Sequence, residues 1–151
     1  PSKGSIKYNL NSVNVAAEEA TLLMSYTGPD QNLIEEMTLK EHLKFHFQFK
    51  RALFDSEEGI QKAGLKGAEN TFIKEFSSGM KQRLKLALAL FSESRILLLD
   101  EPTAFMDSQA IEWYRSEMLD LINKKTMIIA SNQTHEYDFI SNIVAMEDYH
   151  T

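Results

Sequence analysis

The sequence contains no cysteine, which excludes disulfide bonds and thiolate metal sites and agrees with a reducing compartment. It also lacks any apolar run long enough for a transmembrane helix. The polar start of the chain does not have the form of a signal peptide. We therefore expect a cytoplasmic protein whose role at a membrane, where it has one, comes through a partner.

The sequence likewise lacks an excess of basic residues. Its net charge is −6 and its pI is near 5.2, whereas proteins that bind a nucleic-acid backbone usually carry a basic face. We therefore predict no nucleic-acid partner. The 151 residues suit a single domain, and 43% hydrophobic with 25% charged residues is ordinary for a globular chain.

The second half of the chain alternates apolar runs of strand length with segments of helical periodicity. Ile96–Leu99 is a continuous apolar run, typical of a strand buried in a parallel sheet. Asp107 begins a predicted helix, and another strand is predicted at 127–130. This order predicts an α/β fold with a parallel sheet flanked by helices. Further strands are predicted at 5–8, 22–26 and 143–146.

The middle of the chain, about residues 34–90, is predicted to be a mostly helical subdomain, with 1–33 and 91–151 forming part of the core. Thr38 and Glu41 form a capping box, so a helix should begin there. Asp55 with Glu58 predicts a second, short helix. A third should follow Ser77, because leucines recur after it at helical spacing.

Two groups of side chains in the first of these helices are predicted to be structural. His42 and His46 lie one turn apart but lack a third metal ligand, so we expect them to face solvent or a partner. The rings of Phe45, Phe47 and Phe49 are expected in the core, with one or two of them facing a partner.

Two consecutive carboxylates follow the buried strand. Asp100 and Glu101 stand where it ends, and ligands of open α/β sheets bind at the carboxyl ends of strands. One acid can hold Mg²⁺ together with substrate phosphates, and the other can orient or deprotonate a water molecule. The alternative is a strand that simply ends in a solvated acidic turn.

A second candidate site precedes this strand, where small residues open a helix. The free N–H groups of a helix start attract phosphate, and Gly79 would let a phosphate approach the backbone closely. The alternative is that Ser77 is an ordinary helix cap.

Together the two segments resemble the ABC (ATP-binding cassette) ATPase family. Phe76–Met80 is similar to the family's signature, usually written LSGGQ, with Ser78 and Met80 departing from it. Ile96–Glu101 resembles the Walker B strand, and the segment ending at Asp107 resembles the D-loop. The resemblance runs from Gly4 to about Met146, and it implies a P-loop NTPase-like sheet.

The family implies a role for each matching residue. By that resemblance Asp100 helps to hold Mg²⁺, Glu101 polarises the hydrolytic water, and Asp107 is the acid of the D-loop. The signature of one subunit contacts ATP held by another, and the positions carried over for this contact are Ser77, Ser78, Gly79 and Met80.

The sequence departs from the family in three further places. No glycine is followed by the Gly-Lys-Ser/Thr of the phosphate-gripping Walker A loop, so the chain as written should not hold ATP alone. Because Pro1–Ile6 resembles the segment downstream of that loop, we expect an N-terminal truncation. Asn132 stands at the position of the switch histidine, with His135 three residues later. Pro29 or Gln31 stands where the family's Mg²⁺-linked glutamine is usual.

The leading hypothesis is an ATPase subunit of an ABC transporter, using ATP and Mg²⁺. It would pair with a second such subunit and with a transmembrane permease, on the inner face of the cell membrane. One alternative is a non-catalytic module that only lends its signature, or a degenerate relative. Another is a soluble ABC ATPase acting on nucleic acid or ribosomes, which the acidic pI disfavours.

Overall fold

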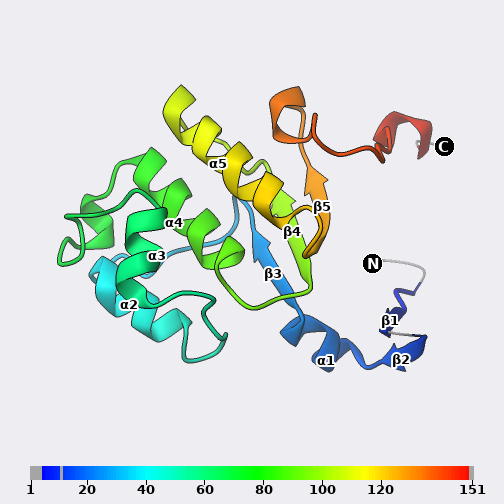
Figure 1. Cartoon of the computed structure of the whole chain (residues 1–151), viewed down its shortest axis with the longest axis horizontal. Coiled ribbons are helices and arrows are strands. Elements are labelled where there is room, and N and C mark those ends of the chain that lie inside the picture. The colour runs from blue at the N-terminus through cyan, green and yellow to red at the C-terminus, as the bar shows by residue number, and fades with distance from the viewer. Residues whose placement is uncertain (1–4, 11, 150–151) are drawn as a thin grey trace.

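A computed structural model describes residues 5–10 and 12–149 of the chain. Its centre is a three-stranded parallel sheet in the order β3-β4-β5 (Figure 1). The strands are β3 (Met24–Thr27), β4 (Ile96–Asp100) and β5 (Thr126–Ala130). Because all three run in the same direction, their carboxyl ends lie at one edge of the sheet.

Helices and a small hairpin surround this sheet. The hairpin pairs β1 (Tyr8–Leu10) with β2 (Val13–Val15) in antiparallel fashion. Figure 1 shows α2, α3 and α4 gathered on the side of the molecule away from the two termini. The α-helices are α1 (Ala17–Leu22), α2 (Leu39–His46), α3 (Ser56–Lys62), α4 (Ser78–Leu90) and α5 (Ser108–Leu121). Short 3-10 helices are η1 (Ile73–Glu75), η2 (Thr134–Glu136) and η3 (Met146–Tyr149).

The core lies between the helices and one face of the sheet. Leu97 and Leu99 of β4 belong to one buried cluster with Leu84 of α4 and with Tyr114 and Met118 of α5. Side chains on the opposite face of the sheet remain accessible: Tyr26 is 45% exposed and Ile128 is 58% exposed. The predicted α/β fold with a parallel sheet flanked by helices is confirmed.

Helices α2 to α5 each begin where the sequence places the cap. The side chain of the residue before α2, α3, α4 and α5 accepts a hydrogen bond from the backbone N–H three positions later. These caps are Thr38, Asp55, Ser77 and Asp107, and Thr38 forms the full capping box with Glu41. A cap satisfies an N–H group that the helix itself cannot, which explains why these local predictions hold.

The predictions for the termini of the chain are only partly correct. Residues 143–146 do not form a strand; η3 begins at Met146 instead. The first strand begins at Tyr8 rather than Ser5, and the second predicted strand begins at Met24, because Leu22 ends α1. Residues 1–4, part of the segment expected downstream of the phosphate loop, lie outside the described residues.

The predicted exposure of the histidine pair is wrong. His42 is only 6% exposed, and the His46 ring, also largely shielded, hydrogen-bonds to Ser92 Oγ at 3.1 Å. Ser92 donates its single hydroxyl proton to Leu88 O, so its oxygen must accept from Nε2–H of His46. His42 is therefore buried, and His46 is half-buried and held by Ser92.

The phenylalanines divide between core and surface. Phe47 packs against the buried cluster, as predicted for the core. Phe45 and Phe49 are 39% and 70% exposed and stack edge to face with ring centroids 5.2 Å apart. The helix ends at His46, so Phe47 and Phe49 follow it instead of extending its apolar stripe.

Candidate functional site

The two carboxylates predicted to carry the chemistry lie at the carboxyl edge of the sheet. Asp100 is the last residue of β4, and Glu101 begins the turn that follows. Glu101 has a φ of 46°, in the left-handed region that non-glycine residues rarely adopt. Its N–H donates to Ala130 O at the end of β5, at 2.9 Å, which holds the start of the turn against the neighbouring strand.

Asn132 is brought to the same place. It follows β5, and its Nδ2 donates to Glu101 Oε1 at 3.4 Å. A neutral amide at this position orients a carboxylate by donating a hydrogen bond, without adding charge. The side chain of Asp100 makes no hydrogen bond or ion pair in the described part of the chain, so its oxygens are free to accept.

The start of α4 faces the segment that follows β4. A Cβ added to Gly79 would lie 3.2 Å from Phe105 O, so only a residue without a side chain fits there comfortably. Ser77 Oγ accepts from Met80 N at 3.2 Å. The N–H groups of Ser78 and Gly79 have no partner among the residues that the structure covers, and they remain available to an anion.

The other two predicted positions lie near this edge of the sheet but differ in exposure. Gln31 is half-buried, and its Oε1 is buried without a partner in the described structure. Pro29 is exposed, and its carbonyl accepts from Lys85 Nζ at 3.5 Å. Both follow β3, so residues that follow each of the three strands lie toward this edge of the sheet.

Met80 and Asp107 have structural contacts besides the roles expected for them. Met80 packs partly buried against the core, which leaves its backbone near the site while its side chain faces inward. Asp107 caps α5 by accepting from Ala110 N at 2.8 Å. Lys81, next to Met80, forms an ion pair with Glu35, which connects α4 to the loop before α2.

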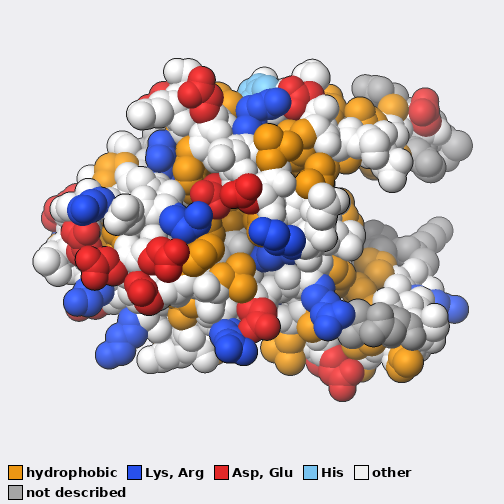
Figure 2. Space-filling model, in the orientation of Figure 1, with side chains coloured by type: hydrophobic (Ala, Val, Ile, Leu, Met, Phe, Trp, Pro, Cys, Tyr) orange, Lys and Arg blue, Asp and Glu red, His pale blue; other side chains and the backbone are white. Residues whose placement is uncertain are grey.

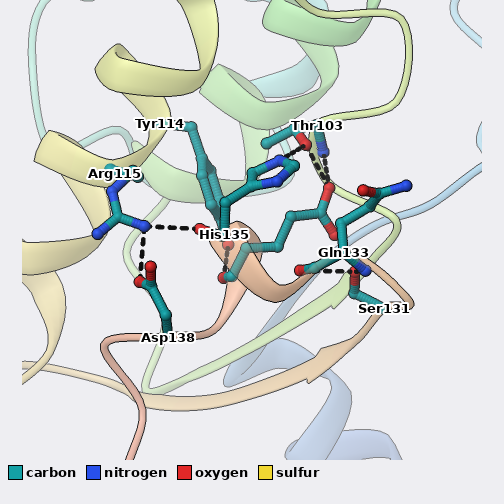
Figure 3. A network of polar contacts seen from close by, with 8 residues as sticks. Thr103, Tyr114, Arg115, Ser131, Gln133, His135 and Asp138 are labelled. Carbon is teal, nitrogen blue, oxygen red and sulfur yellow. Dashed lines mark hydrogen bonds and ion pairs between the residues drawn. The ribbon is translucent and has the colours of Figure 1, made fainter. Parts of the chain in front are cut away.

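Two residues that the sequence did not single out, Gln82 and Glu136, contact the acidic turn together with His135. Gln82 Nε2 of α4 donates to Pro102 O at 2.8 Å, and the carboxylate of Glu136 accepts from Thr103 N at 2.7 Å. Figure 3 shows the surroundings of the second contact, where His135 Nε2 also lies 3.0 Å from Thr103 Oγ1. The only local signal was the polar Gln82, two positions before the buried Leu84 on the same helix.

Phe105 was also missed. Its φ is 65° and its side chain is 78% exposed, the highest value among the exposed large hydrophobic residues described. A bulky residue in the left-handed region costs free energy, and nothing in the local sequence indicates that conformation.

The donor set fits a magnesium ion that arrives with phosphate better than a metal held by protein alone. Among residues 5–10 and 12–149 no group of three or more His, Asp or Glu side chains could enclose a metal ion. Mg²⁺ usually keeps several water molecules and binds one or two carboxylates plus substrate phosphates. The carboxylate of Asp100 would supply one such ligand.

The surface chemistry is mixed. On the face drawn in Figure 2, acidic and basic side chains are interspersed over the helical part, and no extended basic patch is visible there. No helix in the described part is long and apolar enough to span a bilayer.

The parallel sheet, the acidic turn and the capped helix start define the class of this protein. The family model described as "ABC transporter" matches residues 1–104, and the chain therefore belongs to the ABC transporter family. The predicted family resemblance is confirmed.

Individual relatives agree with this assignment. The chain is 33% identical over 123 residues to the methionine import ATP-binding protein MetN 2 of Listeria monocytogenes serotype 4b (strain F2365), covering 76% of this chain and 36% of that protein. It is 31% identical over 126 residues to the aliphatic sulfonates import ATP-binding protein SsuB of Bacillus subtilis (strain 168), covering 82% and 46%. The chain thus spans less than half the length of these two relatives.

The solved structures support the fold. The dimeric ATP-binding cassette MJ0796, bound to ADP and Pi in a post-hydrolysis state, superposes with a TM-score of 0.68. The two sequences are 21% identical, and the superposition covers 86% of this chain and 64% of that one.

Proposed function

We propose that this chain is part of the ATP-hydrolysing subunit of an ABC transporter, and that it supplies the acidic turn and the phosphate-facing helix start. The observation that carries the proposal is the approach of Gly79 to Phe105 O. It brings the start of α4 next to the turn that contains Glu101. The printed functions of the two import relatives support transport as the purpose of the hydrolysis.

Each residue has a defined part in the proposed reaction. Asp100 would hold Mg²⁺, which neutralises charge on the phosphates when bound. Glu101 would orient the attacking water, with Asn132 fixing one of its carboxylate oxygens. The N–H groups of Ser78 and Gly79, assisted by the α4 dipole, would bind a phosphate oxygen. Ser77 holds this helix start in shape by capping it.

The proposed partners follow from the arrangement of this chain. By the resemblance of Phe76–Met80 to the family signature, the α4 start is proposed to contact ATP held by a second ABC subunit. The dimeric state of MJ0796 supports a two-subunit assembly. We further propose that residues 34–90 form the helical subdomain that docks on a permease, which would place the protein on the inner face of the membrane.

The proposal is tested by replacing Glu101 with Gln in the natural gene product, isolated with its partners from its source. The amide keeps the size of the side chain but cannot accept a proton from water, so Mg²⁺-dependent ATP turnover should fall by about 100-fold or more. Equilibrium binding of ATP should stay within about twofold of the wild type. A variant with normal turnover would remove Glu101 from the reaction.

The same preparation distinguishes the alternatives. Co-purification with a membrane permease supports the transporter subunit. A protein that stimulates hydrolysis by another ABC subunit, and hydrolyses nothing itself, would be a signature-donating module. Recovery with ribosomes or nucleic acid instead would refute the transport role.

A further inference from the structure

The acidic turn has a conformation that needs support from outside. Glu101 has a left-handed backbone, and such strain persists only where the surrounding structure fixes it. Two consecutive residues of the turn, Pro102 and Thr103, are buried, with Thr103 only 6% exposed. Their polar backbone groups must therefore find partners within the protein.

Two buried side chains supply those partners. Gln82 is 6% exposed, and the bond from its Nε2 to Pro102 O is the one hydrogen bond of this side chain in the described structure. Glu136 is fully buried, and its Oε1 accepts from both the N–H and the hydroxyl of Thr103. Gln82, on α4, precedes the turn in the sequence, and Glu136, on η2, follows it, so both flanking segments hold the turn.

The burial of the Glu136 carboxylate costs free energy, so packing alone does not explain a glutamate at this position. Its Oε2 has no partner among the described residues, and none of the described ion pairs involves this carboxylate. A buried carboxylate without a cation is less favourable than an apolar side chain of the same size. Tyr114 OH donates to the backbone carbonyl of Glu136 and not to its carboxylate. The hydrogen bonds of the carboxylate in the described structure therefore all come from Thr103, in the turn.

From these contacts we propose that Gln82 and Glu136 are positioning residues for Glu101. They fix the turn from which the carboxylate of Glu101 projects, and Gln82 also couples that turn to the start of α4. Gln82 lies on the first turns of the same helix as Gly79, so a displacement of the helix start is transmitted to Pro102 O. This role rests on the proposed function, whereas the clamp, meaning the hydrogen bonds of Gln82 and Glu136 to Pro102 and Thr103, is a property of the fold.

The first test is hydrogen exchange of the 151-residue chain, resolved to single amides. The variants Gln82→Met and Glu136→Leu keep side-chain size but remove the donor and the acceptor. The amides of Glu101 and Thr103 should exchange at least about tenfold faster, whereas those of β4 should change by less than about twofold. Arg115→Gln is the matched control, because Arg115 donates to His135 O and Asp138 in the same network without touching the turn (Figure 3).

A merely structural role gives a different pattern. If the two side chains only stabilise the whole protein, protection will fall uniformly, in β4 as much as in the turn, and the clamp is refuted. Glu136→Gln retains an acceptor for Thr103 and should restore most of the protection at the turn. Failure of this conservative variant to do better than Glu136→Leu would also count against the proposal.

The second test uses the natural gene product with its partners. Gln82→Met should lower kcat for ATP hydrolysis by about tenfold and leave KM for ATP within about twofold, because the turn orients water and does not bind nucleotide. Unchanged kcat would overturn the positioning role. A wild-type protein without ATP turnover would instead refute the proposed function. The hydrogen-exchange experiment would still test, independently, whether Gln82 and Glu136 fix the turn.

Discussion

The half-buried His46 makes the stability of this protein depend on pH. Burial, the neighbouring His42 and the ammonium of Lys50 lower the pKa of His46 from 6.5 to about 4. Burial also lowers the pKa of His42. The folded protein therefore keeps His46 neutral at pH values where the unfolded chain has already bound a proton.

The sign follows from proton binding. Above pH 6.5 the imidazole is neutral in both states, and its contribution to stability is fully present. Between pH 6.5 and pH 4 the unfolded chain binds more protons, so stability falls as the pH falls through this window. From pH 7.5 to pH 5 the full shift corresponds to ~2 kcal/mol, and partial solvent access to the ring reduces this to about 1–2 kcal/mol.

The assay is urea unfolding at several pH values, followed by the fluorescence of the one tryptophan, Trp113, which is half-buried on α5. His46→Gln is the informative variant, because a glutamine amide can donate to Ser92 Oγ but does not titrate. At pH 5 the variant should have lost about 1–2 kcal/mol less than the wild type has. Parallel pH profiles for the two proteins would refute this account of His46.

Two substitutions test the packing elsewhere. Thr27 is fully buried and its hydroxyl has no partner among the described residues, so Thr27→Val should raise the free energy of unfolding by about 1 kcal/mol in urea titrations; a loss of stability would contradict this. Gly64 has a φ of 67°, and an added Cβ would lie 2.4 Å from Arg83 Nη1. Gly64→Ala should therefore lower the free energy of unfolding by about 1–2 kcal/mol, measured in thermal unfolding. Combining it with Arg83→Ala should recover only the part of this loss that comes from the steric clash. Full recovery would show that the left-handed backbone of residue 64 costs an alanine nothing.

The features that the sequence predicts well are those decided by a few neighbouring residues. The cap of α5 needs only Asp107 and the N–H of Ala110, so the start of that helix can be predicted from neighbouring residues. The strand β4 can be predicted because its four consecutive apolar residues, Ile96–Leu99, suit a strand buried in a parallel sheet. In contrast, residues 143–146 are apolar but pair with no strand in the described part, and strand formation depends on such a neighbour.

The hydrogen bonds that hold the acidic turn could not be predicted, because they join residues far apart in the sequence. Glu136 contacts Thr103 across 33 positions of sequence, and Gln82 contacts Pro102 across 20. No periodicity or local motif links residues that far apart. The left-handed backbone of Glu101 is equally hidden, because glutamate does not favour that region and the conformation follows from the tertiary contacts of the turn.

The topology nevertheless explains why residues predicted separately meet at one edge. Parallel strands place the residues that follow β3, β4 and β5 at the same end of the sheet, which brings Gln31, Glu101 and Asn132 to it. Helix α4 leads into β4 through only five residues, 91–95, and must therefore run back along the sheet in the opposite direction. Its start then lies beside the end of β4, where Gly79 meets the carbonyl of Phe105. The order helix, short link, strand is thus enough to set the start of α4, the proposed phosphate-binding element, against the turn that carries Glu101, and the hydrogen bonds from Gln82 and to Glu136 then fix that turn.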